Sequence, residues 1–334
     1  MVYASHKEYR NVWDNAENET PPVPINLDLE LASLCQLRCP FCFISDGSFD
    51  KMIQQKEPDG KSRRRLMPKE LAFRIIDQAA KIGVPALKFN WRGESTLHPD
   101  YSEIIQYARK YIIIPGNIAH RTDSFHELLT NTNANCQQHA IDGLMACTKV
   151  MVSLDSMIPK TYEIMRRGGD LHLAKETVWK LVVRSHPNIW VRRVLTKDNQ
   201  GEDFYADVKK EWGDKVKVSE HHCFDRNENQ GHQIVDEDSK LLERTYCGYP
   251  SQRIIIAASG LAYPCCIDLH QTMPIGDFNK ESLLEIWNGD KMQQLRKELK
   301  EGIFKSDICK NCVSWMSFKS NKRNFVQDIE LKNE

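Results

Sequence analysis

The sequence lacks any long apolar segment. None of its stretches approaches the roughly 20 apolar residues that a membrane-spanning helix needs, and the N-terminal MVYASHKEYRNVWDN has no apolar signal-peptide core. Net charge is also lacking, because 46 Lys and Arg residues balance 46 Asp and Glu residues. No overall field therefore favours nucleic acid or a membrane surface. We expect a cytoplasmic protein without a membrane or nucleic-acid partner.

Cysteine, in contrast, is abundant, and eleven cysteines in a reducing compartment indicate metal or redox chemistry more than disulfides. Cys35, Cys39 and Cys42 fall within one short stretch, and the next cysteine is Cys136. A complete iron–sulfur run supplies four cysteines. A cluster held by only three thiolates keeps one iron open, where a small molecule can coordinate and react. A zinc site with a distant fourth ligand is the alternative.

Hydrophobic periodicity predicts that strands and helices alternate along most of the chain. Apolar alternation and runs predict strands at 25–31, 86–91, 128–130, 149–154, 189–194 and 216–218. Helical patterns lie between them at 68–82, 99–111, 136–146 and 172–184, and a further one lies at 204–212. Such alternation implies a parallel sheet with right-handed crossovers, and six units are too few for a closed eightfold barrel. We predict an open partial barrel, with the cysteine loop at the carboxyl end of its first strand.

The sequence divides into five predicted segments. These are an N-terminal extension (1–24), the partial barrel (25–222), a polar linker (223–243), a C-terminal domain (244–320) and a tail (321–334). The C-terminal domain has a predicted β-hairpin at 253–263 around Ser259-Gly260, followed by helices near 282–287 and 291–300. The polar stretch 46–66 and the segment 112–126 are predicted surface loops.

A second set of cysteines lies in the C-terminal domain: Cys247, Cys265, Cys309 and Cys312. Four thiolates fully ligate one iron–sulfur cubane or one zinc ion, and spacing alone leaves both open. Cys266 is next to Cys265 and is the alternative ligand at that position. Cys136, Cys147 and Cys223 have no motif around them and are expected to be ordinary buried thiols.

The spacing of Cys35, Cys39 and Cys42, with Phe41 before the last cysteine, resembles the radical S-adenosylmethionine (SAM) superfamily. The resemblance implies a partial (β/α)6 barrel and a [4Fe–4S] cluster whose open iron holds SAM. Reductive cleavage of SAM would give a 5′-deoxyadenosyl radical that abstracts a substrate hydrogen. It also implies an electron donor such as flavodoxin or ferredoxin.

The C-terminal domain resembles the SPASM/twitch extension of the same superfamily. The resemblance rests on Cys247-Gly248, on Tyr263-Pro264-Cys265 and on the pair Cys309–Cys312. It implies an auxiliary [4Fe–4S] cluster held by Cys247, Cys265, Cys309 and Cys312, and therefore two [4Fe–4S] clusters in all. Because no cysteine follows Cys312, the shorter, single-cluster twitch version is expected.

Further residues match motifs that hold SAM in this superfamily. Arg92-Gly93-Glu94 resembles the Gly-Gly-Glu motif, which implies that Gly93 and Glu94 meet the SAM ammonium, although Arg92 departs from the pattern. Ser153-Leu154-Asp155 resembles the Ser-Leu-Asp signature near the ribose and carboxylate. The remaining implied contacts are Asn131 in a Thr-Asn segment, Arg166 or its neighbour Arg167 at the carboxylate, and the backbone of Phe41 at the adenine. A plain turn and surface salt bridges are the alternatives.

Four thiolates leave no open iron on the auxiliary cluster, so electron exchange is its expected role. We therefore predict a two-electron oxidation of a small molecule or peptide. A redox-neutral isomerase or epimerase, a non-catalytic electron carrier and a zinc-stabilised interaction protein are the alternatives. The two dozen residues before the first strand are too few for a folded peptide-binding domain, which favours a small molecule or a separately recruited peptide. No pattern indicates a catalytic acid or base.

Overall fold

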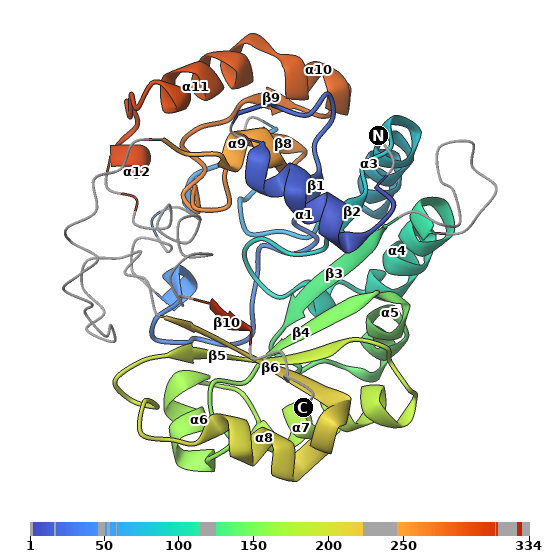
Figure 1. The fold of residues 1–334 in the computed structure, drawn as a ribbon, viewed down its shortest axis with the longest axis vertical. Coiled ribbons are helices and arrows are strands. Elements are labelled where there is room, and N and C mark those ends of the chain that lie inside the picture. The colour runs from blue at the N-terminus through green and yellow to red at the C-terminus, as the bar shows by residue number, and fades with distance from the viewer. Residues whose placement is uncertain are drawn as a thin grey trace.

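The computed structural model describes residues 3–16, 18–45, 51, 54–57, 59–113, 125–222, 246–310, 312 and 326–328. Within these ranges the chain forms one mixed sheet flanked by helices (Figure 1). Its strand order is β10-β6-β5-β4-β3-β2-β1-β7-β8-β9. The predicted linker 223–243 and Cys223 lie outside the described residues, as do parts of the predicted loops 46–66 and 112–126 and most of the tail 321–334.

The strands β1 to β6 follow one another in chain order, and each is parallel to the next. Helical segments connect them, so the predicted partial (β/α)6 barrel is confirmed. The six strands are β1 (Asn26–Leu29), β2 (Ala86–Lys88), β3 (Glu127–Thr132), β4 (Lys149–Ser153), β5 (Ile189–Leu195) and β6 (Val216–His222).

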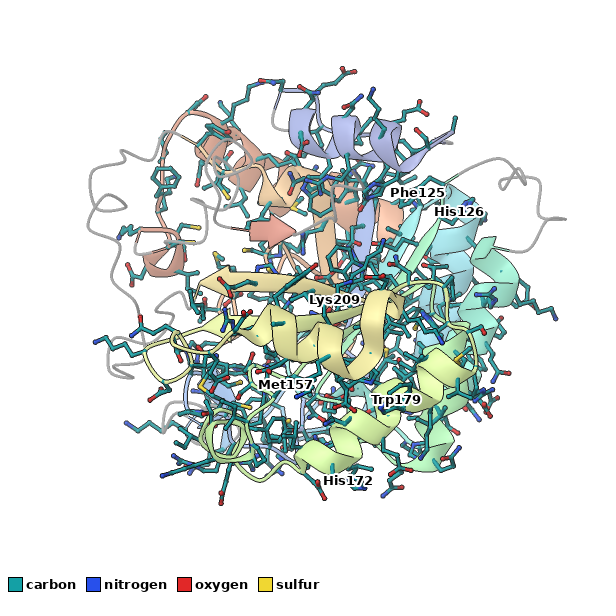
Figure 2. All side chains as sticks on the ribbon, turned by 60° about the horizontal axis from the view of Figure 1, so that its bottom comes forward. Phe125, His126, Met157, His172, Trp179 and Lys209 are labelled. Atoms are coloured by element: carbon teal, nitrogen blue, oxygen red, sulfur yellow. The ribbon has the colours of Figure 1, made fainter. Side chains whose placement is uncertain are left out.

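The connecting helices cover one side of the sheet and enclose the main core. Figure 2 shows this side, with Trp179 of α7 and Lys209 of α8 on neighbouring helices; the Trp179 indole donates to Glu211 of α8 at 3.0 Å. The helices are α3 (Lys69–Ile82), α4 (Tyr101–Ala108) continued by a π-helical turn (Arg109–Ile113), α5 (Ile141–Ala146), α6 (Pro159–Met165), α7 (Leu171–Val183) and α8 (Phe204–Trp212).

Helix α3 illustrates why these segments form where they do. Leu71, Ile75 and Ile76 recur at helical spacing and are buried against the leucines of β1. Burying each such side chain contributes about 1.5–3 kcal/mol. The helix ends at Gly83, whose φ of +79° is the left-handed conformation that glycine adopts at little cost. Helix α3 therefore connects β1 to its parallel neighbour β2 along the chain.

The C-terminal region continues the same sheet. Strand β7 (Arg253–Ile256) is parallel to β1, and β8 (Leu261–Tyr263) and β9 (Gly276–Asp277) add antiparallel strands beyond it. The predicted hairpin is therefore present, and its first strand also extends the barrel sheet. The helices here are α9 (Tyr249–Gln252), α10 (Leu283–Asn288), α11 (Asp290–Lys300) and α12 (Asp307–Lys310). In Figure 1, α10 and α11 lie at the opposite end of the molecule from α6–α8.

The N-terminal extension contains a helix that its polar composition did not predict. Helix α1 (His6–Asn15) begins at Ser5, whose hydroxyl accepts from the Glu8 backbone N–H. Tyr9 of this helix packs with Tyr3, Ile25 and Phe125 in a small aromatic core. This packing ties the extension to the start of β1.

Helix α6 and strand β10 were also not predicted. Helix α6 is only seven residues long, too short to show a clear apolar period. Strand β10 (Val326–Asp328) pairs antiparallel with β6 inside the predicted tail. No helix in the described ranges has both the length and the apolarity that a membrane crossing needs.

Candidate functional site

The two faces of the sheet differ in chemistry. Leu27 and Leu29 of β1 are buried against the helices, so the alternating residues Asn26 and Asp28 lie on the other side. We call that side, turned away from α3–α8, the inner face. By the same alternation and register it includes Lys88 of β2, Asn131 of β3, Ser153 of β4, Arg192 of β5 and Arg253 of β7. These polar and charged side chains could bind a polar molecule on the inner face.

The three-cysteine loop follows β1 at its carboxyl end, as predicted. Cys39 is buried, whereas Cys35 and Cys42 are half-buried. The loop closes through a hydrogen bond from the Cys42 backbone N–H to the Cys39 carbonyl at 3.0 Å. Burial raises the pKa of the Cys35 thiol to about 12, and the nearby thiols of Cys39 and Cys42 contribute to the same shift.

Hydrogen-bond donors from distant elements reach these sulfurs. The Leu37 backbone N–H lies 3.4 Å and the Asn133 amide nitrogen 3.8 Å from Cys35 Sγ. The Arg166 guanidinium lies 3.6 Å from Cys39 Sγ. Donors and a cation around thiolates stabilise negative charge, as a thiolate-ligated iron–sulfur cluster requires. Three thiolates on one loop, surrounded in this way, fit such a cluster.

No three His, Cys, Asp or Glu side chains of the described ranges converge as ligands of a single metal ion. A cubane does not need such convergence, because each thiolate binds a different iron. The arrangement of Cys35, Cys39 and Cys42 is consistent with this mode of ligation.

The predicted Ser-Leu-Asp and arginine residues meet next to the cysteine loop. Asp155 is fully buried with a φ of +67°, and its carboxylate pairs with Arg166 Nε at 2.6 Å. The same carboxylate accepts the Val194 backbone N–H at 2.8 Å. Burial raises the pKa of Asp155, whereas Arg166 opposes the shift. Arg166 also lies over the Phe41 ring at 5.6 Å, so it bridges the end of β4 and the cysteine loop.

The neighbouring Arg167 has a different position. Its backbone carbonyl accepts the Arg38 N–H at 2.8 Å, so it contacts the cysteine loop through the main chain. Of the two arginines that the sequence offered, Arg166 is the one whose guanidinium reaches both Asp155 and Cys39.

Gly93 lies where only glycine fits. Its φ is +66°, and an added Cβ would overlap the Ala32 carbonyl and come within 2.6 Å of the Leu34 carbonyl. The next residue, Glu94, donates its backbone N–H to the same Leu34 carbonyl at 2.8 Å. The turn after β2 is therefore pressed against the start of the cysteine loop.

The Glu94 carboxylate is buried and joins the ends of two strands. It accepts from the hydroxyls of Thr96 at 2.7 Å and Thr132 at 2.9 Å, and from the Asn133 backbone N–H at 2.7 Å. Burial raises the pKa of Glu94, and these hydrogen bonds oppose the shift. Among the described residues, Glu94 Oε2 accepts only the Asn133 N–H, which leaves it acceptor capacity for an ammonium group.

Asn131 and Ser153 lie on the inner face, where their strand positions place them. The Asn131 backbone N–H donates to Asn90 Oδ1 at 3.1 Å. Its own side-chain oxygen is buried without a hydrogen-bond partner among the described residues. A buried acceptor of this kind is available to a ligand on the inner face.

The second set of cysteines is only partly brought together. The hydrogen bond with Cys266 and burial raise the pKa of Cys265, and the charge of nearby Cys247 adds to the shift. The Ile267 backbone N–H also lies 3.3 Å from Cys265 Sγ. Cys266 instead packs with Ile255 and Tyr263 and feels the charges of Arg253 and Lys88 on the inner face. This placement favours Cys265 as the partner of Cys247.

Cys309 and Cys312 lie on one turn at the end of α12, where the Cys312 N–H donates to the Cys309 carbonyl at 3.4 Å. Their closure on Cys247 and Cys265 stays a prediction. Cys136 and Cys147 are buried in the main core, as expected of ordinary thiols.

The model of the radical SAM superfamily matches residues 29–209, and that of the SPASM iron–sulfur cluster-binding domain matches residues 247–313. The first match alone spans more than half of the chain. The protein belongs to the radical SAM superfamily. Its cofactors are accordingly SAM and [4Fe–4S] clusters, with one cluster region in each matched segment.

Several curated proteins are similar in sequence to parts of this radical SAM protein. A 67-residue stretch is 40% identical to the SAM-dependent 2-deoxy-scyllo-inosamine dehydrogenase of Niallia circulans, covering 20% of this chain and 27% of that one. GTP 3′,8-cyclase of Clostridium botulinum is 24% identical over 55% of this chain and 52% of its own. Mycofactocin maturase of Mycobacterium ulcerans is 23% identical over 59% and 47%. The chain thus spans about half, or less, of these relatives.

Solved structures share the fold. BtrN in complex with AdoMet and 2-DOIA has a TM-score of 0.54 at 18% identity, covering 87% of this chain and 93% of that one. SuiB of Streptococcus suis bound to the precursor peptide SuiA has a TM-score of 0.64 at 13% identity, covering 95% and 77%. The partial barrel with a C-terminal extension is therefore a shared architecture.

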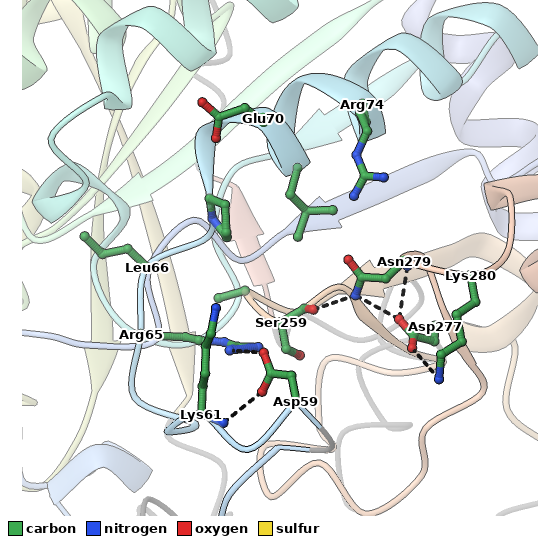
Figure 3. A pocket seen from close by; sticks show the side chains of 13 residues that line it. Asp59, Lys61, Arg65, Leu66, Glu70, Arg74, Ser259, Asp277, Asn279 and Lys280 are labelled. Carbon is green, nitrogen blue, oxygen red and sulfur yellow. Dashed lines mark hydrogen bonds and ion pairs between the residues drawn. The ribbon is translucent and has the colours of Figure 1, made fainter.

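A pocket of about 660 Å³ lies away from this site, between α3 and the β8–β9 region (Figure 3). The Arg65–Asp59 ion pair, at 2.6 Å, lines one side, and Asn279, which donates to the Ser259 carbonyl at 2.9 Å, lines another. None of the residues predicted to bind SAM or iron lines this pocket. This pocket is therefore separate from the candidate site.

Proposed function

We propose that this radical SAM protein oxidises a small molecule or a peptide by two electrons. The bound cofactors supply hydrogen-atom abstraction and electron transfer, which side chains alone do not provide. Within this proposal Cys35, Cys39 and Cys42 hold the cluster that binds SAM. Cys247, Cys265, Cys309 and Cys312 hold the auxiliary cluster.

The chain's own residues would orient SAM at the carboxyl ends of the strands. Gly93 allows the backbone after β2 to approach the ligand closely, and Glu94 offers a carboxylate oxygen to the SAM ammonium. Arg166 is fixed by Asp155 beside Cys39, where its guanidinium favours negative charge on the sulfurs and on the SAM carboxylate. Asn131, Ser153 and the Phe41 backbone would complete the contacts.

The observation that supports the oxidation is that the three-cysteine loop and the segment of Cys265 and Cys266 both adjoin the inner face. The three-cysteine loop follows β1, and Cys266, next to Cys265, faces Lys88 and Arg253. The Trp91 indole donates to the Cys266 carbonyl at 2.9 Å and so ties this segment to the turn after β2. A substrate on the inner face would lie near both segments, and an auxiliary cluster held at Cys265 could then take up the electron that an oxidation releases.

The comparisons support this proposal without fixing the substrate. The dehydrogenase with 40% identity in one segment favours an oxidation. The cyclase, the maturase and the peptide-bound SuiB act on or bind other classes of molecule by name, so both a small molecule and a peptide stay candidates. An electron donor such as flavodoxin or ferredoxin is part of the proposal.

Reductive cleavage of SAM tests the first part of the proposal, that Cys35, Cys39 and Cys42 hold the SAM-binding cluster. With dithionite, the anaerobically reconstituted wild-type protein should form 5′-deoxyadenosine, and a Cys35→Ala/Cys39→Ala/Cys42→Ala variant should form none. Cys136→Ala, a buried thiol outside both sets, is the matched control and should keep the activity. Cleavage that persists in the triple variant would contradict the assigned site, and its absence in the wild type would favour a plain electron carrier.

The mass of the product tests the second part of the proposal, the two-electron oxidation of the substrate. The compound consumed from a cell extract should lose two hydrogen atoms for each SAM cleaved, because one leaves to the radical and the other as a proton with the released electron. Mass spectrometry of extracts incubated with and without the enzyme measures this. A product of unchanged mass would instead indicate an isomerase or epimerase.

A further inference from the structure

The inner face carries a group of charges, one buried carboxylate and two half-buried cations, that the SAM and cluster sites do not use. Asp28 of β1 lies in register with Lys88 of β2. Arg253 of β7 lies in register with Asn26, which is two residues before Asp28 on β1 and on the same face. All three side chains are on the inner face, because their neighbours Leu27, Leu87 and Ile254 are in the core on the other side. The charges therefore converge from three adjacent strands.

Two cations of this group, Lys88 and Arg253, face a single carboxylate, and the Cys266 thiol is the other ionisable group beside them. Asp28 is fully buried, and its nearest cation in the group is Arg253, whose Nη1 lies 3.4 Å away. In the part of the chain that the structure describes, no carboxylate lies within ion-pair distance of the Lys88 ammonium, and Arg253 Nε is buried without a hydrogen-bond partner. One carboxylate thus faces two cations from adjacent strands.

The two half-buried cations have lost part of their hydration, and a bound anion would compensate them. Glu30 does not supply that anion, because its carboxylate is already bound by both ends of the Arg92 guanidinium at 2.6 and 2.8 Å. Burial lowers the pKa of Lys88, as expected for an ammonium whose opposite charge is incomplete, although Asp28 opposes the shift.

We propose that Lys88 and Arg253 bind an anionic group of the substrate, a carboxylate or a phosphate. This inference rests on the proposed function and names the class of substrate for it.

The arginine is already fixed for this role. Its guanidinium lies over the rings of Trp13, 4.7 Å from the centroid, and of Tyr249, 4.9 Å from the centroid. A planar guanidinium held in this way loses little freedom when it binds a carboxylate or phosphate through two hydrogen bonds. Lys88 provides a point charge from the neighbouring side. Helix α1, which carries Trp13, thereby acquires a role in positioning the substrate.

Calorimetry on the anaerobically reconstituted protein with both clusters tests the proposal, using inorganic phosphate in one arm and acetate in the other. Binding of at least one anion to the wild type is expected. The anion that binds more tightly indicates whether the substrate's anionic group is a phosphate or a carboxylate. Lys88→Met should weaken that binding roughly tenfold or more, because it removes one charge-assisted contact. Asp28→Asn should strengthen it, because it removes the competing carboxylate.

Lys280→Met is the matched control, since Lys280 is exposed and pairs with Asp277 at the surface, and its anion affinity should equal that of the wild type. Equal affinities in Lys88→Met and the wild type, or no binding of either anion to the wild type, would overturn the proposal. Circular dichroism of each variant establishes that it is folded. The opposite signs expected for Lys88→Met and Asp28→Asn cannot come from a general loss of structure. Reductive SAM cleavage by the wild type tests the proposed function separately. Absence of anion binding would therefore contradict this inference alone, and absence of SAM cleavage would contradict the proposed function.

Discussion

Glu94 shows how one side chain serves both the fold and the proposed site. Its carboxylate fastens the turn after β2 to the end of β3 through Thr132 and Asn133. Asn133 in turn reaches Cys35 Sγ at 3.8 Å. The Glu94 carboxylate is therefore linked to the cysteine loop through Asn133. One of its oxygens also has capacity for a further hydrogen-bond donor.

We predict that Glu94→Ala weakens SAM binding by about tenfold, because it removes a charged acceptor from the SAM ammonium group. The dissociation constant for SAM, measured on the reconstituted protein, checks this, and iron content should be unchanged. Glu103→Ala on the exposed side of α4 is the control and should bind SAM as the wild type does. An unchanged constant in Glu94→Ala would leave the residue with its strand-joining role alone.

Residues of the site were predictable from sequence where a local pattern dictates their type. Gly93 is such a case, since its backbone conformation and its contact with Ala32 admit no side chain. Asn133, Lys88 and Arg253 were not singled out, because their roles depend on contacts between segments far apart in the chain. Only the alternation of Asp28 with buried leucines hinted that β1 has a polar inner face.

At the scale of elements, the buried Arg92–Glu30 pair joins three segments. Arg92 stands where the superfamily motif has glycine, and its guanidinium binds Glu30 at the end of β1 and the Leu269 carbonyl at 3.3 Å. Glu30 also accepts the Ala258 N–H, at 3.1 Å, from the segment after β7. The departure from the motif thus connects the SAM-binding turn to the C-terminal region.

We predict that Arg92→Met lowers the free energy of unfolding by about 3–5 kcal/mol, because it leaves the Glu30 carboxylate buried and unpaired. The double variant Arg92→Met/Glu30→Gln should recover part of the loss. Chemical denaturation under anaerobic conditions measures both. Arg184→Met, which removes the exposed Arg184–Asp142 pair, is the control and should change stability by about 1 kcal/mol or less. Equal losses in the two single variants would contradict a role for the buried pair.

The elements themselves were predictable in proportion to their length and periodicity. Helices α3 and α8 have long apolar stripes and lie where the pattern put them. Helix α6 is short, and the pairing of β7 with β1 joins segments more than two hundred residues apart, so neither leaves a local signal. Helix α1 has a polar composition and gains its order from the aromatic contacts of Tyr9.

For the whole molecule, the continuous sheet determines how the two matched regions relate. Because β7 pairs directly with β1, the segment that holds Cys265 and Cys266 extends the same surface that begins beside the three-cysteine loop. A radical enzyme that oxidises its substrate needs both an abstracting centre and an electron acceptor near one molecule. One sheet with a shared inner face would provide the proposed arrangement without a movable joint between β1 and β7.

The last prediction concerns the iron content of the chain. Anaerobically reconstituted protein should hold about eight iron and eight sulfide per monomer, since each cubane contributes four of each. The Cys35→Ala/Cys39→Ala/Cys42→Ala and Cys309→Ala/Cys312→Ala variants should each keep about half, with the Cys136→Ala control unchanged. Loss of metal and loss of folding are coupled, so circular dichroism must accompany the iron assay. A folded wild-type protein that saturates at four iron and binds zinc would show that Cys247, Cys265, Cys309 and Cys312 form a zinc site. In that case the electron released by an oxidation would have no acceptor in the C-terminal region, and the proposed oxidation would fail with it.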